Sequence, residues 1–190
     1  MASPEERQTR LLEMYREAHR RGGWFHGTAI RGHIEDIGRV IQETGSKTLL
    51  DYGCGKAVYY VQNKVHHQWG VTPTFYEPGI EKWAKKPDGK FDGVVCTDVL
   101  EHVLEPEKVL KEVIGYAEKF CYLAISCQHS PPTKKLPDGT PLHISVHPPS
   151  WWRERIEPYK HIRIEVRFDV EEPSASETLS SERGSQEKQG

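Results

Sequence analysis

The sequence predicts an α/β fold in which a mostly parallel sheet is covered by helices on both faces. Short apolar segments of strand length alternate with amphipathic segments of helical period, which is the pattern of parallel strands joined by crossover helices. The 190 residues are enough for one hydrophobic core and too few for two ordinary domains. Ligands of such sheets bind at the carboxyl ends of the strands, so we expect the functional residues there.

The N-terminal part of the chain predicts two helices. Ser3, Pro4 and two acidic residues are typical of a helix start, and apolar residues then recur at helical spacing as far as Gly22. Isoleucines at 30, 34, 37 and 41 form one stripe of a second helix, which Gly45 ends. An aromatic and glycine-containing loop, 24–28, joins the two helices.

The rest of the chain predicts five strands with helices between them. The strands are expected at 48–50, 74–76, 91–97, 121–126 and 162–170. The helices are expected at 56–68, 81–85, 105–119 and 151–156. Residues 127–149 form a proline-rich loop that is much longer than an ordinary connection, and a loop of this length is usually functional.

Composition excludes several classes of protein. The net charge of −2 gives no global basic field for attracting nucleic acid. The four cysteines lack the spacing of a zinc site and are expected to be reduced thiols. No apolar run reaches the ~18–20 residues of a membrane span, and the polar start is unlike a signal peptide, so we expect a cytoplasmic protein. The Ser-, Glu- and Gln-rich segment 171–190 is expected to be a disordered acidic tail.

A glycine turn between the first buried strand and the following helix gives the strongest functional signal. Gly53 and Gly55 permit a tight turn and let a ligand lie against bare backbone, and Asp51 stands where the strand ends. Glu77 ends the next strand, at a spacing that suits a carboxylate accepting both hydroxyls of a ribose. The pattern therefore indicates a ligand that contains a nucleoside.

Together with the stretch 91–103, these elements resemble the class I S-adenosylmethionine-dependent methyltransferases, in particular short, phage-encoded ones. The resemblance covers roughly 47–127 and implies a Rossmann-like, three-layer αβα fold with an abbreviated sheet. It implies a cofactor-binding core at 47–170, a substrate loop at 127–149, and N-terminal helices with a cofactor-covering loop at 1–46. The alternative is a nicotinamide-binding Rossmann domain, which predicts a third glycine where this chain has Val58.

The resemblance also implies roles for single residues. Gly53 and Gly55 would pack on the methionine part of the cofactor, Asp51 would order its amino group through water, and Glu77 would bind the ribose. The complete set of expected cofactor-binding residues is Asp51, Gly53, Cys54, Gly55, Glu77, Pro78, Thr97, Asp98, Phe25 and Gly27.

The chain departs from the family pattern in two places. Ala57 stands where many members have another glycine. Few residues separate Glu77 from Phe91, so the segment that usually supplies an adenine contact is shortened or missing. The residue that contacts adenine is therefore left open.

A second group of residues suggests a metal site. Asp98, Glu101 and His102 would share one face of a helical turn, and with His143 from the long loop they could hold Mg²⁺ or a borderline divalent metal. Similar runs bind metal in ubiquinone-pathway O-methyltransferases and in small-RNA 2′-O-methyltransferases, which begin with Glu where this chain has Asp98. The alternative is a purely structural Glu-His-Val signature.

The candidate catalytic residues are His143, His147 and Asp98, because a histidine in the long loop could act as a base or orient the acceptor. The chain lacks the motifs of amino- and C5-directed DNA methyltransferases and a target-recognition domain, which makes sequence-specific DNA methylation unlikely. We expect a small-molecule or nucleotide-like acceptor methylated on oxygen or nitrogen. The alternatives are a metal-dependent RNA 2′-O-methyltransferase and a catalytically silent partner subunit that binds S-adenosylmethionine.

Overall fold

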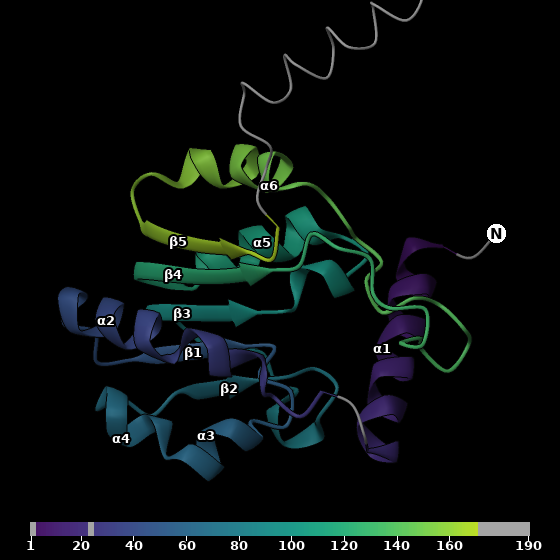
Figure 1. The fold of residues 1–190 in the computed structure, drawn as a ribbon, viewed down its shortest axis with the longest axis horizontal. Coiled ribbons are helices and arrows are strands. Elements are labelled where there is room, and N and C mark those ends of the chain that lie inside the picture. Colours follow the sequence, from purple (N-terminus) through teal and green to yellow (C-terminus); the bar gives the residue numbers. More distant parts are fainter. Residues whose placement is uncertain (1–2, 23–24, 171–190) are drawn as a thin grey trace, which may run out of the picture.

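Five strands form one parallel sheet in the computed structural model, which describes residues 3–22 and 25–170 (Figure 1). The strand order is β2-β1-β3-β4-β5, and every neighbouring pair is parallel. The direction of winding therefore reverses between β1 and β3, and the switch point of the sheet lies at their carboxyl ends. The strands are β1 Leu49–Tyr52, β2 Thr74–Tyr76, β3 Phe91–Thr97, β4 Ala117–Ile125 and β5 Arg163–Phe168.

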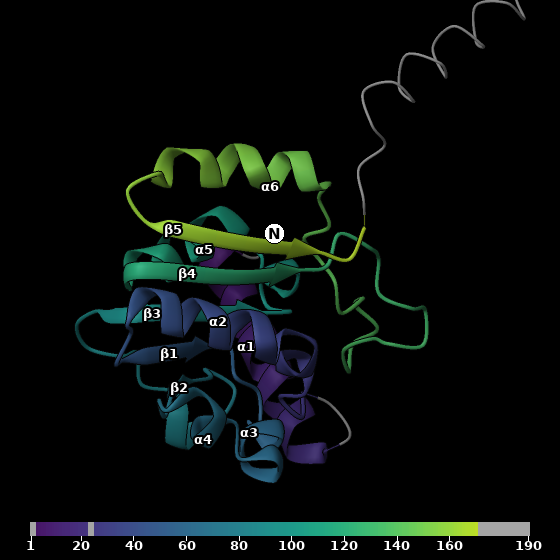
Figure 2. The ribbon, with the colours of Figure 1, turned by 60° about the vertical axis from the view of Figure 1, so that its left-hand side comes forward.

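Helices cover both faces of the sheet, which confirms the predicted α/β fold with three layers (Figures 1 and 2). One face packs on α2 (Ile34–Thr44), α3 (Val58–Asn63) and α4 (Val65–Trp69). The other packs on α5 (Pro106–Gly115) and α6 (Pro149–Ile156). Helix α1 (Pro4–Arg21) instead crosses the end of the sheet to which the strands point (Figure 1). Short 3₁₀ helices span Ala29–His33, Glu81–Trp83, Leu100–His102 and Glu157–Tyr159.

Successive side chains along each strand point to opposite faces of the sheet, so the hydrophobic core has two layers. In β3, Val95 packs against the helices of one face, whereas Val94 and Cys96 pack against those of the other. All three side chains are almost completely buried, as expected of a central strand covered on both sides. The sheet is thus held from both faces, and its carboxyl edge is left to form a site.

The predicted ends of α1 and α2 agree with the structure. Ser3 and Glu6 form a reciprocal capping box at the start of α1, with the Glu6 amide 3.1 Å from the Ser3 hydroxyl. Gly45 ends α2 in the left-handed conformation at φ 58°. The stripe of isoleucines divides between the 3₁₀ helix that contains Ile30 and α2 itself.

The helix expected over 81–85 is the shorter 3₁₀ helix Glu81–Trp83, and α6 begins at Pro149, two residues before its predicted start. Two further predicted helices have the wrong extent. The helix expected over 56–68 is two helices, because Lys64 adopts a left-handed backbone at φ 49° and separates α3 from α4. The helix expected over 105–119 ends at Gly115, and β4 begins at Ala117 rather than at Cys121. Strand β4 starts early because it pairs with β3 from its first residue. Ala117 pairs with Phe91, and the Tyr116 carbonyl accepts the Phe91 amide at 2.8 Å.

The segment between β2 and β3 is shortened, as the sequence predicted. Within the described residues it contains the 3₁₀ helix Glu81–Trp83 and no strand. In the part of the chain that the structure describes, the sheet therefore ends at β2 on this side.

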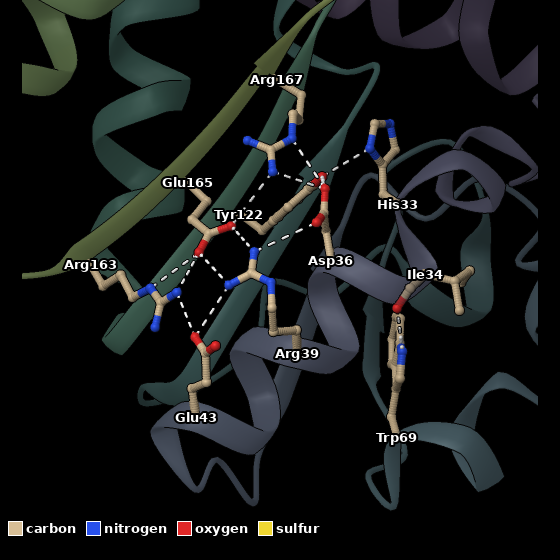
Figure 3. Close-up of polar contacts among 10 residues, drawn as sticks. All are labelled: His33, Ile34, Asp36, Arg39, Glu43, Trp69, Tyr122, Arg163, Glu165 and Arg167. Atoms are coloured by element: carbon tan, nitrogen blue, oxygen red, sulfur yellow. Dashed lines mark hydrogen bonds and ion pairs between the residues drawn. The ribbon is translucent and has the colours of Figure 1, made fainter.

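A network of ion pairs ties the edge strand β5 to α2 (Figure 3). Arg167 donates two hydrogen bonds to Asp36, at 2.9 and 3.1 Å, and Arg39 donates to Glu165 at 2.8 Å. Apart from Glu165, these side chains are well exposed to solvent, so each pair adds little stability, at about 0–1 kcal/mol. Their main effect is to fix the position of Asp36 relative to β5.

Among the described residues no helix has both the length and the apolar character needed to cross a bilayer. The tail predicted over 171–190 lies outside the described residues.

Candidate functional site

A cavity of about 1110 Å³ opens at the carboxyl edge of the sheet, where the winding reverses. Its walls come from α1, from the loop before α2, from the ends of β1 to β5 and from the long loop after β4. The volume exceeds the ~300–1,000 Å³ of ordinary small-molecule pockets. It therefore has room for a nucleoside-sized ligand together with a second molecule.

The backbone geometry of the turn after β1 explains why it contains glycines. Gly53 and Gly55 have φ angles of 84° and 53°, in the left-handed region that favours glycine. A Cβ on Gly55 would lie 2.6 Å from the Phe25 carbonyl oxygen, and one on Gly53 would overlap the Val99 side chain. Ala57 is also left-handed, at φ 50°. The close approach of the Phe25 loop and of Val99 therefore requires glycine at both positions, and both glycines line the cavity.

The loop before α2 packs backbone to backbone against this turn. The Lys56 amide donates to the Phe25 carbonyl at 2.9 Å, and the Val58 amide donates to the His26 carbonyl at 3.0 Å. A Cβ on Gly27 would lie 2.5 Å from the Ala57 nitrogen, so this approach requires glycine. Phe25 and Gly27 both line the cavity. The Thr28 side chain, which precedes the 3₁₀ helix Ala29–His33, forms no capping hydrogen bond.

Glu77 joins the ends of β1 and β2. Its Oε2 accepts the Gly55 amide at 3.1 Å, and its Oε1 accepts the Gly79 amide at 3.0 Å. His19 of α1 places its Nε2 3.6 Å from Oε1. Because a carboxylate has about four lone-pair sites, Glu77 can still accept hydrogen bonds from a ligand in the cavity.

Asp51 and Cys54 lie beneath the turn and are not among the residues that line the cavity. Burial raises the pKa of Asp51 to about 7, and the neighbouring charge of Glu77 adds to this. The other residues predicted to bind the cofactor do line the cavity, namely Phe25, Gly27, Gly53, Gly55, Glu77, Pro78, Thr97 and Asp98.

Asp98 does not share a helical face with Glu101 and His102, and that prediction is wrong. Asp98 has a left-handed backbone at φ 53° and precedes the 3₁₀ helix that starts at Leu100. Its amide donates to the Ala124 carbonyl of β4 at 3.0 Å, which turns the residue away from helical geometry. The side chain lines the cavity, and burial raises its pKa.

Glu101, His102 and His143 converge, with one ligand atom of each within 4.8 Å of the others. His102 Nδ1 lies 2.8 Å from the Leu142 carbonyl, and His143 Nδ1 lies 2.6 Å from the Gln128 carbonyl. A carbonyl only accepts, so each Nδ1 carries the proton and each Nε2 keeps its lone pair.

The third member of this group is a buried acid. Glu101 Oε1 accepts the Ser126 amide at 3.2 Å, whereas Oε2 is buried with no hydrogen-bond partner. Burial raises the pKa of Glu101 to about 8 and lowers that of His102 to about 4. A buried carboxylate oxygen without a partner is costly, and a bound cation would compensate it.

The structure separates the two loop histidines that were expected near the acceptor. His143 lines the cavity, but His147 is not among its lining residues. The His147 ring instead stacks on Trp151, with centroids 3.8 Å apart and planes 7° apart. Trp152 is completely buried, and Trp151 is partly buried against the same core.

Sequence reasoning missed the cavity residues supplied by the N-terminal helices. Tyr15 of α1 donates to the His102 carbonyl at 3.1 Å, and His19 approaches Glu77. His33 lines the cavity and lies 2.9 Å from the Tyr122 hydroxyl of β4 (Figure 3). Helical spacing places Tyr15 and His19 on one stripe of α1, which was the only available signal for them.

Comparison with known families gives one match. The model of a family described as a methyltransferase domain matches residues 26–165. A search of curated proteins finds no similar sequence. The matched region includes the glycine turn, Glu77 and the converging group at Glu101. The family match does not support a phage origin or a particular cellular compartment.

Proposed function

The chain belongs to the methyltransferase-domain family, and from that premise we propose that it methylates an oxygen or nitrogen of a small-molecule or nucleotide-like acceptor. Membership makes the domain an S-adenosylmethionine-dependent methyltransferase and excludes the nicotinamide alternative. One observation carries the proposal. The cavity at the switch point is lined both by the Gly53–Gly55 turn with Glu77 and by Asp98 and His143.

The Gly53–Gly55 turn and Glu77 fit S-adenosylmethionine. The bare backbone at Gly53 and Gly55 can lie against the methionine part, and Glu77 can accept ribose hydroxyls. When bound, S-adenosylmethionine supplies a methyl group on a positively charged sulfur, which needs no further activation. The protein's contribution is then to align the acceptor and exclude water.

The exclusion of water follows from the N-terminal segments. Leu11 of α1 is buried against Leu136 and Leu142 of the long loop, and Phe25 packs against the same cluster. Arg10 adds an ion pair to Asp138 at 3.3 Å. Two segments far apart in sequence thus pack against each other beside the cavity, which Phe25 and Leu142 line.

The size of the acceptor is supported by the cavity and its charges. After a nucleoside-sized ligand is placed, the remaining space suits a single small molecule or nucleotide. Cations and acids both line the wall, among them Lys108, Lys134, Glu105 and Asp169. An extended duplex would need a continuous basic surface, which the net charge of −2 does not favour.

A methyl-transfer screen tests this proposal. The chain is incubated with methyl-tritiated S-adenosylmethionine and either a small-molecule extract, total RNA or total protein. We expect label in the small-molecule or nucleotide fraction, and none with Gly53→Val, whose side chain would overlap Val99. Cofactor binding by the wild type without any transfer would instead support a catalytically silent partner subunit.

The group at Glu101 favours a second candidate, a metal-dependent RNA 2′-O-methyltransferase. Two imidazole nitrogens and one carboxylate suit a borderline metal such as Mn²⁺, Co²⁺ or Zn²⁺. They do not fit Mg²⁺, which prefers oxygen ligands and keeps several waters. If a metal is bound, Glu101, His102 and His143 would hold it and it would supply a Lewis acid beside the acceptor.

This candidate predicts that Mn²⁺ or Zn²⁺ binds in calorimetry and that Mg²⁺ does not. Glu101→Gln and His102→Ala should each abolish binding, whereas His67→Ala, an exposed histidine of α4, should not. A chelator should then stop methylation of RNA in the screen. Unchanged turnover in chelator would exclude the metal-dependent reaction.

A further inference from the structure

A chain of hydrogen bonds leads from the surface of β5 to the wall of the cavity and ends at His33 (Figure 3). Arg167 donates to Asp36, Tyr122 donates to the same Asp36 oxygen at 3.4 Å, and His33 Nδ1 lies 2.9 Å from the Tyr122 hydroxyl. The residues come from β5, α2, β4 and the 3₁₀ helix before α2. His33 itself lines the cavity, as does Asp98.

The direction of these hydrogen bonds determines where the proton of His33 lies. Tyr122 has one hydroxyl proton, and it is donated to Asp36. In this arrangement the Tyr122 oxygen accepts from His33, and Nδ1 carries the imidazole proton. Nε2 is then the nitrogen with the lone pair.

Burial favours the neutral form of His33. Burial lowers its pKa most, and the cation Arg167 lowers it further. The carboxylates of Asp98 and Asp36 act in the opposite direction without overcoming the burial. A neutral imidazole with an available lone pair is the form that can accept a proton.

The other histidines of the cavity are engaged differently. His102 and His143 converge on Glu101, and His19 approaches Glu77. His26 also lines the cavity, and its backbone carbonyl accepts the Val58 amide. His33 belongs to neither group. Its Nδ1 lies within hydrogen-bond distance of the uncharged Tyr122 hydroxyl, which in turn donates to the Asp36 carboxylate. In a general base of this kind, the hydrogen bond to Nδ1 orients the imidazole ring, and the nearby carboxylate stabilises the protonated ring.

We propose that His33 is the general base of the methyl transfer, with Tyr122, Asp36 and Arg167 as positioning residues. The inference rests on the proposed function. The acceptor's O–H or N–H proton passes to His33 Nε2, and the electron pair of that bond stays on the acceptor atom. The acceptor atom uses a pair to bond the methyl carbon, while the carbon–sulfur pair leaves with sulfur. The imidazolium later returns its proton to solvent.

The first arm of the test is histidine NMR on the full chain with S-adenosylhomocysteine bound. We expect His33, assigned through His33→Gln, to be neutral with its proton on Nδ1 and to titrate below its ordinary pKa. Tyr122→Phe should remove that tautomer preference, and Tyr159→Phe, outside the chain of hydrogen bonds, should not. A proton on Nε2 in the wild type would overturn the inference without any acceptor being known.

The second arm measures transfer to the fraction labelled in the screen. His33→Gln should bind S-adenosylhomocysteine as the wild type does but transfer methyl groups about 100-fold more slowly or worse. Added imidazole should restore part of the rate of His33→Ala, whose cavity admits it. An undiminished rate in folded His33→Gln overturns the inference, whereas wild type that binds no S-adenosylhomocysteine overturns the proposed function itself.

Discussion

The backbone amide of Gly55 donates to Oε2 of Glu77 across 3.1 Å, although 22 residues separate them. The bond joins the glycine turn after β1 to the acid after β2, and the Gly53 and Cys54 amides both donate to the Tyr76 carbonyl nearby. The two strand ends therefore form one rigid unit before any ligand arrives. A preformed unit of this kind lowers the ordering cost of binding.

Glu77→Ala should weaken binding of S-adenosylhomocysteine by at least about tenfold, because it removes the carboxylate assigned to the ribose. It should also cost about 1–3 kcal/mol of stability, because the Gly55 and Gly79 amides lose their acceptor. Calorimetric titration and urea unfolding measure the two effects. Unchanged affinity in a folded variant would contradict the ribose assignment.

Gly27→Ala should destabilise the chain by more than a left-handed backbone alone accounts for. Its new Cβ would be 2.5 Å from the Ala57 nitrogen and would push the Phe25–Thr28 loop off the glycine turn. Gly45→Ala is the matched control, because Gly45 is also left-handed but has open space around it. The control should cost about 1–2 kcal/mol. Equal losses in the two variants would show that the loop is not packed against the turn.

The stability of the wild type should decrease as pH rises from about 4 to about 7, because Asp51 binds its proton more tightly when folded. Its folded pKa of about 7 lies above the ordinary 3.8, so the stabilising effect is complete at low pH and is lost as Asp51 ionises. Asp51→Asn cannot titrate and should show a shallower dependence. Urea unfolding at several pH values compares them, and parallel curves would refute the assignment.

Lys64→Gly should raise stability by about 0.5–1 kcal/mol, because glycine adopts the left-handed conformation between α3 and α4 without strain. Gln62→Gly, at an exposed position inside α3, should lower stability by a similar amount. Thermal melting distinguishes the two signs. A loss with Lys64→Gly would mean that the Lys64 side chain supports the junction.

The strands were the part of the fold most accessible from sequence. Thr74–Tyr76 and Phe91–Thr97 were predicted to the residue, because each is a short apolar run with turn residues on both sides. The start of β4 was missed because exposed Glu118 and Lys119 continue the charge pattern of the preceding helix. The break at Lys64 was missed because periodicity carries no information about a single left-handed residue.

The residues of the candidate site also fall into two groups, those that local motifs predict and those that only the packing of the fold brings together. Gly53, Gly55 and Glu77 lie in local motifs, so their spacing along the chain was enough to place them at neighbouring strand ends. His33 and Tyr122 are 89 residues apart and belong to no motif, so only the packing of α2 on the sheet brings them together. His147 was named from the same local segment as His143, but its stacking on Trp151 depends on where α6 packs.

Calorimetric titration of the wild-type chain with S-adenosylmethionine and with S-adenosylhomocysteine tests the central claim most directly. The cavity, the glycine turn and Glu77 predict micromolar binding of both, with one site per chain. Absence of binding to either in a folded chain would contradict the assignment of this cavity to the methyl donor.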